Sequence, residues 1–196
     1  MVPKAYGDLK MRTASFLSSY RACQDCKFAI DRFKNEQFSF SQWKIGWAGI
    51  CALLNTSVHL MKNKDAKSCI PEPIKLGLVQ KWHEIGKDRD RYQIYWKFIR
   101  KERNDILKEY EFSAYEVILR SDGYESLFKP ARSMLGLLEE NETEALVIRG
   151  GPYNGRLAIE IANQGVIWVQ ETIFEVLKSA GYDPEEEVKF RDFLSS

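Results

Sequence analysis

The chain has 196 residues, of which 44% are hydrophobic and 29% are charged, with a formal net charge of +1. This composition fits one domain with a full core and excludes a mainly disordered chain. Because the net charge is close to zero, binding to RNA or an anionic membrane needs a local basic patch. The start lacks the apolar segment of a signal peptide and no apolar run spans a bilayer, so we expect a cytoplasmic protein with no membrane partner.

Four helices are predicted in residues 1–112. The first covers about 8–35, and the second runs from a capping box at Ser39–Gln42 to about residue 61, with Gly46 and Gly49 allowing a neighbouring helix to approach closely. A third begins at residues 71–73 and ends near residue 86. A fourth covers 88–112. Short turns between these helices are typical of an antiparallel bundle, so the predicted fold class is all-α, a helical bundle with additional C-terminal helices.

Residues 113–154 are predicted to be an irregular connection of loop and short helix. Two alternatives compete beyond it: residues 145–148 and 157–161 pair as a hairpin, or the second segment begins a helix. The helical spacing continues to near Ser179, which is too long for a strand and favours the helix. Gly181 ends it, and Pro184 is predicted to begin a final short helix. Residues 155–196 are therefore expected to form C-terminal helices packed on the same single domain.

The cysteines and glycines offer two signals of site chemistry, and both favour structural roles. Cys23 and Cys26 form a CxxC pair, but a zinc site would need two further ligands in a matching pattern, and none follows. The glycine cluster at 149–155 lacks the spacing of a phosphate-binding loop and is predicted to be a turn. We therefore expect reduced structural cysteines, no metal and no cofactor.

The helix at 88–112 carries a charge where a core residue is expected. Its apolar positions recur at three- and four-residue steps: Tyr92, Tyr95, Trp96, Ile99, Ile106 and Tyr110. Arg103 lies four residues after Ile99 and three before Ile106, so its guanidinium is predicted to face the packing surface. An unpaired charge is costly there. Either Arg103 pairs with a carboxylate in the bundle or across a dimer interface, or it is held there to bind a phosphate.

The string Arg103-Asn104-Asp105-Ile106-Leu107-Lys108-Glu109-Tyr110 resembles the motif of the HEPN superfamily, small helical bundles that often act as metal-independent ribonucleases. That motif has an arginine, a polar residue that is commonly asparagine, and a histidine five positions after the arginine; one branch adds a tyrosine two residues later. Lys108 stands in place of the histidine. The resemblance implies a homodimer of toxin or anti-phage defence type that binds RNA, with weak or lost ribonuclease activity. It also implies a nucleotidyltransferase antitoxin partner that modifies Tyr110 with AMP.

The resemblance gives a candidate catalytic set of Arg103, Asn104, Lys108 and Tyr110. Metal-free cleavage uses the 2′-hydroxyl of RNA as nucleophile, so the protein must move protons and stabilise charge on phosphorus. Arg103 suits the second task, because its planar fork can hold two phosphate oxygens. A lysine suits proton transfer poorly, since its ordinary pKa is about 10.4. On an ideal helix Lys108 points roughly 140° away from Arg103, whereas Tyr110 returns to its face.

Lys97, Arg100 and Lys101 give the same helix a positive bias interleaved with aromatic residues, which predicts RNA binding. Glu102, Asp105 and Glu109 dilute that bias, so an exposed face laced with salt bridges is the competing interpretation. Two further functions stay open. One is a non-catalytic structural or regulatory helical module that binds proteins, and the other is an active ribonuclease that uses Arg103, Asn104, Lys108 or a histidine from elsewhere.

Overall fold

The computed structural model describes residues 9–35, 40–68, 70–120, 125–126 and 142–195. The main helices are α2 (Ser18–Asn35), α3 (Phe40–Asn63), α4 (Glu72–Lys87), α5 (Arg100–Glu109) and α7 (Ala158–Ser179). A π-helix, η3 (Ile94–Ile99), leads directly into α5. The structure is mostly helical with a few short strands, so the prediction of a helical fold is confirmed at this level. No helix in the described ranges combines the length and hydropathy that crossing a bilayer requires.

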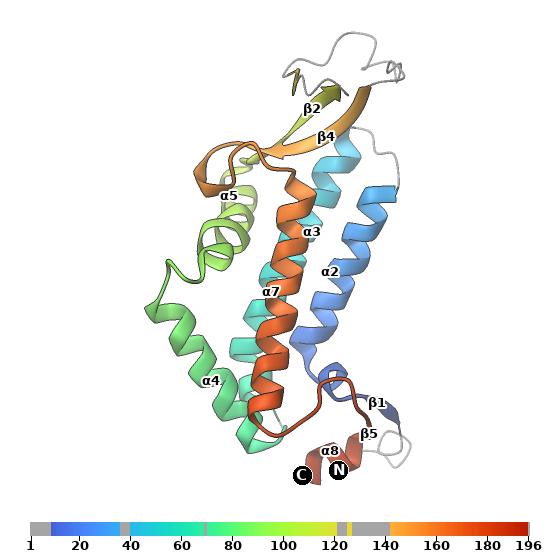
Figure 1. Cartoon of the computed structure of the whole chain (residues 1–196), viewed down its shortest axis with the longest axis vertical. Helices are drawn as coiled ribbons and strands as arrows, with labels where there is room; N and C mark the ends of the chain where they lie inside the picture. The colour runs from blue at the N-terminus through green and yellow to red at the C-terminus, as the bar shows by residue number, and fades with distance from the viewer. Residues whose placement is uncertain (1–8, 36–39, 69, 121–124, 127–141, 196) are drawn as a thin grey trace.

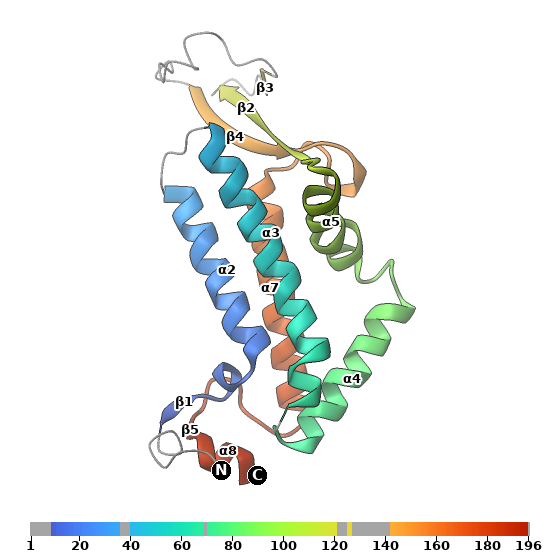
Figure 2. The ribbon, with the colours of Figure 1, turned by 180° about the vertical axis from the view of Figure 1, so that it is seen from behind.

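The core lies between α2, α3 and α7, which run side by side (Figures 1 and 2). Helix α2 runs in the opposite direction to α3 and α7 (Figure 1). Each contributes fully buried side chains, among them Ile30, Trp47 and Ile173. Since α7 packs directly on α2 and α3, residues from the C-terminal part of the chain share the core with those of residues 1–112. The close approach expected at Gly46 is found, because an added Cβ would lie 2.8 Å from the Phe33 ring, whereas Gly49 has open space.

Helix α2 begins later than predicted, at Ser18. The buried Asp65 carboxylate accepts hydrogen bonds from the backbone N–H groups of Ser18 (3.0 Å) and Ser19 (2.8 Å). These donors have no partner within the helix, so a distant carboxylate caps it. Asp65 belongs to the 3-10 helix η2 (Asp65–Lys67) after α3, and the cap therefore ties the end of α3 to the start of α2. Ser39, from the predicted capping box of α3, lies outside the described residues.

Helix α4 begins at the predicted Pro-Glu-Pro signal and packs on α7. Its inward residues are Ile74, Leu78 and Ile85, whereas Val79 is 44% exposed. Lys81 is buried beneath this contact, where its ammonium donates to Glu84 (3.0 Å) and Glu175 (2.9 Å). At Gly77 the two helices approach so closely that an added Cβ would lie 2.9 Å from Cγ1 of Val176.

A two-stranded ribbon joins the beginning and the end of the described chain. β1 (Lys10–Arg12) pairs antiparallel with β5 (Glu187–Lys189), with Lys10 opposite Lys189 and Arg12 opposite Glu187. The ribbon continues in the hydrogen bonds from the N–H groups of Thr13 and Ala14 to the carbonyls of Glu186 and Pro184. These bonds hold 184–186 outside any helix, so the helix predicted to begin at Pro184 is wrong. The last helix, α8, instead covers Phe190–Ser195.

A three-stranded antiparallel sheet lies at the end of the bundle away from this ribbon (Figure 1). Its strands are β2 (Ala114–Arg120), β3 (Glu125–Ser126) and β4 (Glu142–Ile148), in the order β3-β2-β4. β2 and β4 pair from Ala114 opposite Ile148 to Arg120 opposite Glu142. The prediction of loop and short helix in residues 113–154 is therefore wrong for these segments. Ala114 and Ile148, which lie opposite each other in this pairing, are buried in the core, so the sheet is attached to the helices at this end.

The segment after β4 confirms two predictions. The glycine cluster is a turn around the 3-10 helix η4 (Gly151–Tyr153), with positive φ at Gly150, Gly151 and Gly155. Glycine adopts this conformation without the steric cost that other residues meet. Helix α7 then begins at Ala158, as the helical alternative predicted, and Leu157 just before it forms an isolated bridge with Val147.

Candidate functional site

The orientation of α5 is set by the π-helix that precedes it. A π-helix makes i→i+5 hydrogen bonds, so it shifts the residues that face the bundle relative to an unbroken α-helix. The buried residues along η3 and α5 are Tyr95, Phe98, Ile99, Glu102 and Ile106. Phe98, Glu102 and Ile106 follow at four-residue steps, which puts Glu102 at the centre of the inward stripe. The prediction that Arg103 faces the packing surface is wrong by one position.

Glu102 is the buried charge of this helix, with 2% of its surface exposed. Its Oε1 accepts hydrogen bonds from the indole N–H of Trp47 (2.9 Å) and the backbone N–H of Ser113 (3.2 Å), and its Oε2 accepts one from the Ser113 hydroxyl. These donors compensate the cost of burying a carboxylate. Glu102 therefore joins α3, α5 and the segment before β2. In the sequence, the four-residue steps from Phe98 to Glu102 and on to Ile106 are the signal that could have identified Glu102 as an inward-facing residue.

Arg103 lies at the edge of the stripe and is partly exposed. Its Nη1 donates a hydrogen bond to Oδ1 of Asn104 at 2.9 Å. Within the described part of the chain, Arg103 forms no ion pair. The carboxylate partner that one interpretation required inside the bundle is therefore not found among these residues. A neutral amide holds the guanidinium and leaves its charge uncompensated.

Lys108 and Tyr110 are exposed, and the contacts of the described residues do not join either of them to this pair. Helix α5 ends at Glu109, and Tyr110 takes a left-handed conformation (φ 57°) as its C-cap. Its ring packs against Phe112, 5.3 Å between ring centroids, and lies 5.8 Å from Nζ of Lys44. The ideal-helix geometry that returned Tyr110 to the face of Arg103 does not hold once the helix has ended. Of the four predicted catalytic residues, the contacts join only Arg103 and Asn104.

An apolar groove of about 580 Å³ lies between α3 and the end of α5. Its lining residues are Lys44, Ile45, Ala48, Ile106, Leu107, Tyr110 and Phe112. Three of them are strongly exposed for apolar or aromatic residues: Ile45 at 74%, Leu107 at 57% and Tyr110 at 72%. Grouped exposed apolar side chains are a feature of surfaces that bind another molecule.

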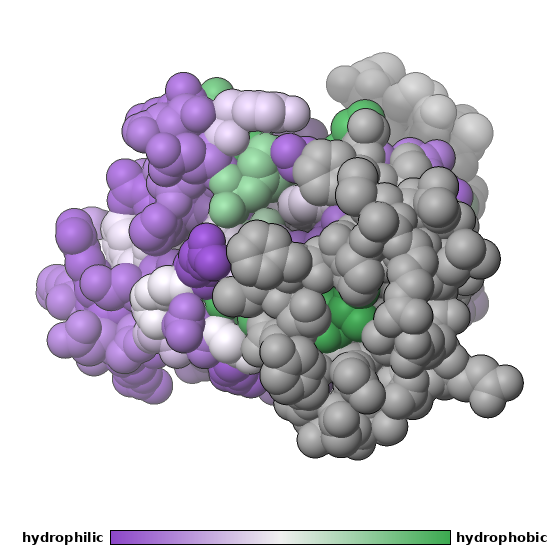
Figure 3. Space-filling view, turned by 90° about the horizontal axis from the view of Figure 1, so that it is seen from above, coloured by the Kyte–Doolittle hydropathy of each residue, from purple (hydrophilic) through white to green (hydrophobic). Residues whose placement is uncertain are grey.

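The three predicted RNA-binding residues, Lys97, Arg100 and Lys101, are all exposed. Lys101 forms an ion pair with Asp105 of the same helix, and this hydrogen bond raises the pKa of the Lys101 ammonium. Arg100 instead lies over the Trp96 ring, 4.9 Å from its centroid. Seen from the sheet end, hydrophilic side chains gather on the side that carries α4 and α5 (Figure 3). All three cations therefore lie at the surface, and one of them, Lys101, is paired with a carboxylate.

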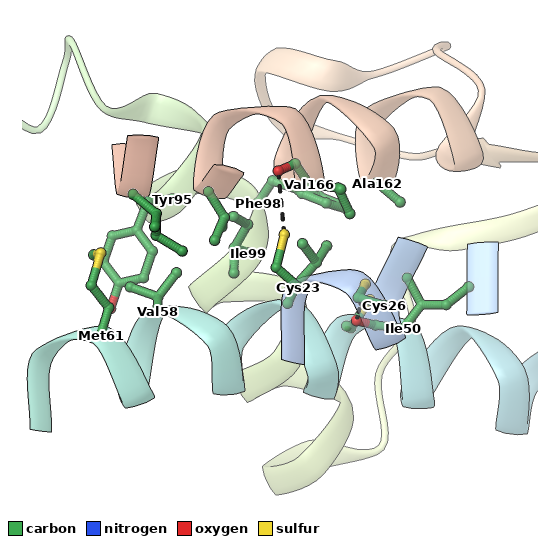
Figure 4. Close-up of a cluster of buried hydrophobic side chains, with 14 of the residues drawn as sticks. Cys23, Cys26, Ile50, Val58, Met61, Tyr95, Phe98, Ile99, Ala162 and Val166 are labelled. Carbon is green, nitrogen blue, oxygen red and sulfur yellow. Dashed lines mark hydrogen bonds between the residues drawn. The ribbon is translucent and has the colours of Figure 1, made fainter. Parts of the chain in front are cut away.

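The cysteines of the CxxC pair are core residues (Figure 4). The thiols of Cys23 and Cys26 contact the backbone carbonyls of Val166 and Ile50 at 3.5 Å, and burial raises the pKa of both to about 12. Cys51 is also a free buried thiol, whereas Cys69 lies outside the described residues. No group of three or more His, Cys, Asp or Glu side chains in the described ranges is placed to hold a metal ion.

The arrangement on α5 is suited to binding an anion rather than to moving a proton. Arg103 and Arg100 supply planar, permanently charged donors. The two histidines lie on other elements, His59 beside Asn63 on α3 and His83 exposed on α4. Comparison of the chain with protein-family models, with curated proteins and with solved structures finds no match. Function is therefore inferred from the side chains and from the motif.

Proposed function

We propose that this chain is an HEPN-like homodimer that binds RNA, of toxin or anti-phage defence type, with weak or lost metal-independent ribonuclease activity. The observation that carries the proposal is the state of Arg103, which is partly exposed, held by Asn104 at 2.9 Å, and without an ion pair among the described residues. A guanidinium fixed by a neutral neighbour keeps its charge available for two phosphate oxygens. Two copies would supply two such groups to one RNA.

The reduced activity in the proposal follows from Lys108. The motif places a histidine at this position, and histidine is the side chain whose protonation changes near neutral pH. A lysine there can attract a phosphate but does not replace a proton-transfer group. Lys108 is also exposed on the last turn of α5, where its role would be that of a surface cation.

The proposal is tested by the affinity for mixed cellular RNA of the full chain and of Arg103→Ala. Loss of a charged contact to phosphate should weaken binding about tenfold or more and reduce the salt dependence. Lys27→Ala removes the same charge from an exposed position on α2 and is the matched control, which should bind as the unaltered protein does. Unchanged affinity in Arg103→Ala, with circular dichroism showing a preserved fold, would contradict the proposal.

The partner part of the proposal is tested on Tyr110. Its 72% exposure makes the phenol reachable by a modifying enzyme. Co-expression with a nucleotidyltransferase encoded beside this chain should add one AMP to the peptide that carries Tyr110, and Tyr110→Phe should abolish the addition. An unmodified Tyr110 after co-expression with an enzyme shown to be active would remove this partner from the proposal.

A second candidate function, a non-catalytic helical module that binds proteins, is favoured by the apolar groove. Ile45 and Leu107 expose 74% and 57% of their surface there. Exposed apolar side chains grouped in this way are typical of a surface that binds another protein. Under this alternative, Leu107→Asp should abolish the association of the chain with a second protein molecule in sedimentation experiments. Arg103→Ala should leave the affinity for RNA unchanged. If Leu107→Asp leaves association intact, this second candidate is excluded.

A further inference from the structure

Trp96 lies beside two arginines that come from different parts of the chain. The guanidinium carbon of Arg89, in the connection after α4, is 4.5 Å from the centroid of the Trp96 ring, and that of Arg100 is 4.9 Å from it. The indole N–H of Trp96 donates to the carbonyl of Ile85 at 2.9 Å, which fixes the plane of the ring. The three side chains therefore form an ordered cation–aromatic layer, named here the Trp96 cluster.

The two arginines of the Trp96 cluster have no ion-pair partner among the described residues. Neither Arg89 nor Arg100 forms an ion pair there, in contrast to Lys101 with Asp105 and Lys81 with Glu84 and Glu175. The nearby Asp88 carboxylate accepts a hydrogen bond from the backbone N–H of Arg91 instead. Two guanidinium groups beside one ring repel each other, so a bound anion would stabilise the arrangement.

The Trp96 cluster continues toward Arg103 along one side of the helix. Arg100 and Arg103 are three residues apart in α5, a spacing at which side chains are neighbours on a helix surface. The side chains of Trp96, Arg100 and Arg103 thus follow one another from η3 into α5. A planar cation and a ring are the groups on which unpaired bases stack, and a line of guanidinium groups suits successive phosphates.

We infer that the Trp96 cluster is a subsite for one unpaired nucleotide, whose base stacks on the guanidinium planes that the Trp96 ring supports while the adjoining phosphate reaches Arg103. The inference rests on the proposed function for its ligand, RNA, and adds the class: single-stranded rather than duplex. A base inside a duplex is already stacked on its neighbours, so it cannot occupy such a layer.

The test uses the full chain and three labelled probes in fluorescence anisotropy: a twelve-nucleotide oligouridine, an abasic strand with the same phosphates, and an RNA duplex of the same length. The unaltered protein should bind the oligouridine about tenfold more tightly than the abasic strand, as expected for one stacked base. Arg89→Lys keeps the charge but loses the plane. It should lose most of that difference, whereas Arg89→Ala should also weaken binding to the abasic strand.

Arg89 is exposed in a connection, so its variants do not threaten folding. If RNA binds but both Arg89 variants match the unaltered protein on every probe, the subsite is excluded while the proposed function stands. Equal affinity for oligouridine and the abasic strand, or preference for the duplex, would also overturn the inference. If instead Arg103→Ala leaves all binding unchanged, the proposed function fails.

Discussion

The indole N–H of Trp47 donates a hydrogen bond to Oε1 of Glu102 across 2.9 Å, and this contact joins α3 to α5 inside the protein. The same carboxylate accepts hydrogen bonds from the backbone N–H and the hydroxyl of Ser113. Glu102 thus accepts three hydrogen bonds from two residues, and α5 cannot rotate about its axis without breaking these bonds. This network therefore fixes the position of the neighbouring Arg103.

Glu102→Ala should destabilise the protein by about 1–3 kcal/mol, because it leaves the buried donors of Trp47 and Ser113 without an acceptor. Glu102→Gln keeps one acceptor oxygen and should lose less. Urea denaturation followed by circular dichroism measures both. Glu109→Ala, at an exposed position of the same helix, should stay within about 0.5 kcal/mol of the unaltered protein. Equal midpoints for the alanine variants would show that the network contributes nothing.

Two glycines of α4 should respond to alanine in opposite directions. At Gly86 an added Cβ meets no atom within 4 Å, so Gly86→Ala should raise the free energy of unfolding by about 0.5–1 kcal/mol through helix propensity. At Gly77 the Cβ would lie 2.9 Å from Cγ1 of Val176, a stiff β-branched side chain. Gly77→Ala should therefore lower the free energy of unfolding by about 1 kcal/mol, after the gain in helix propensity is included. Thermal and urea unfolding of the two variants should differ in sign.

The long helices could be predicted from the sequence because their signals are local. α3 and α7 carry dense apolar residues at helical spacing, and the structure ends them at Asn63 and Ser179, within two residues of the predicted ends. The strands could not be predicted in the same way, since their pairing is not local. The sequence allows residues 145–148 to pair with 157–161, but the structure keeps only the Val147–Leu157 bridge of that pairing. Strand β2, which precedes residues 121–141, pairs with β4 along its whole length.

The site residues stay a prediction, and the sequence could anticipate only one contact among them. The string from Arg103 to Tyr110 places Arg103 beside Asn104, and the structure joins these two by a hydrogen bond. The direction of the Arg103 side chain depends on the π-helix at Ile94–Ile99. A search for apolar residues at 3.6 residues per turn does not reveal a π-helix. Arg89 was not predicted, because only the packing of the α4 connection on η3 brings it to Trp96.

The buried thiols predict a loss of stability at alkaline pH. The pKa of Cys23 is raised by burial to about 12 in the folded protein, against an ordinary value of 9.0. Between these values the unfolded chain loses the thiol proton and the folded protein keeps it, so the folded state binds more protons. The free energy of unfolding should then fall by about 1.4 kcal/mol per pH unit for this thiol.

Urea denaturation at about pH 8 and about pH 10.5 measures this slope, and Cys23→Ala should remove its share of it. Tyr20, Tyr95 and Tyr153 have pKa values raised by burial and add to the slope in the same direction, so only the difference between the two proteins isolates the thiol. Parallel slopes in the two proteins would contradict a buried neutral thiol.

Under the proposed function, replacing Lys108 by the histidine of the HEPN motif should give metal-independent cleavage of RNA. Lys108 is exposed, so Lys108→His should fold as the unaltered chain does and place an imidazole in the motif position. With EDTA present, it should cleave RNA to 2′,3′-cyclic phosphate ends at least about tenfold faster than the unaltered protein. The double variant that also carries Arg103→Ala should be inactive. Cleavage by that double variant would place the chemistry elsewhere.

The pairing of Lys10–Arg12 with Glu187–Lys189 has a mechanical consequence. Residues 9 and 190 leave the ribbon at the same end, so opposed forces on these two residues load its hydrogen bonds one after another rather than together. In an optical-trap experiment with handles at these positions, the ribbon should open like a zipper at low force. The helices would bear load only after the bonds of Thr13 and Ala14 to Glu186 and Pro184 had parted.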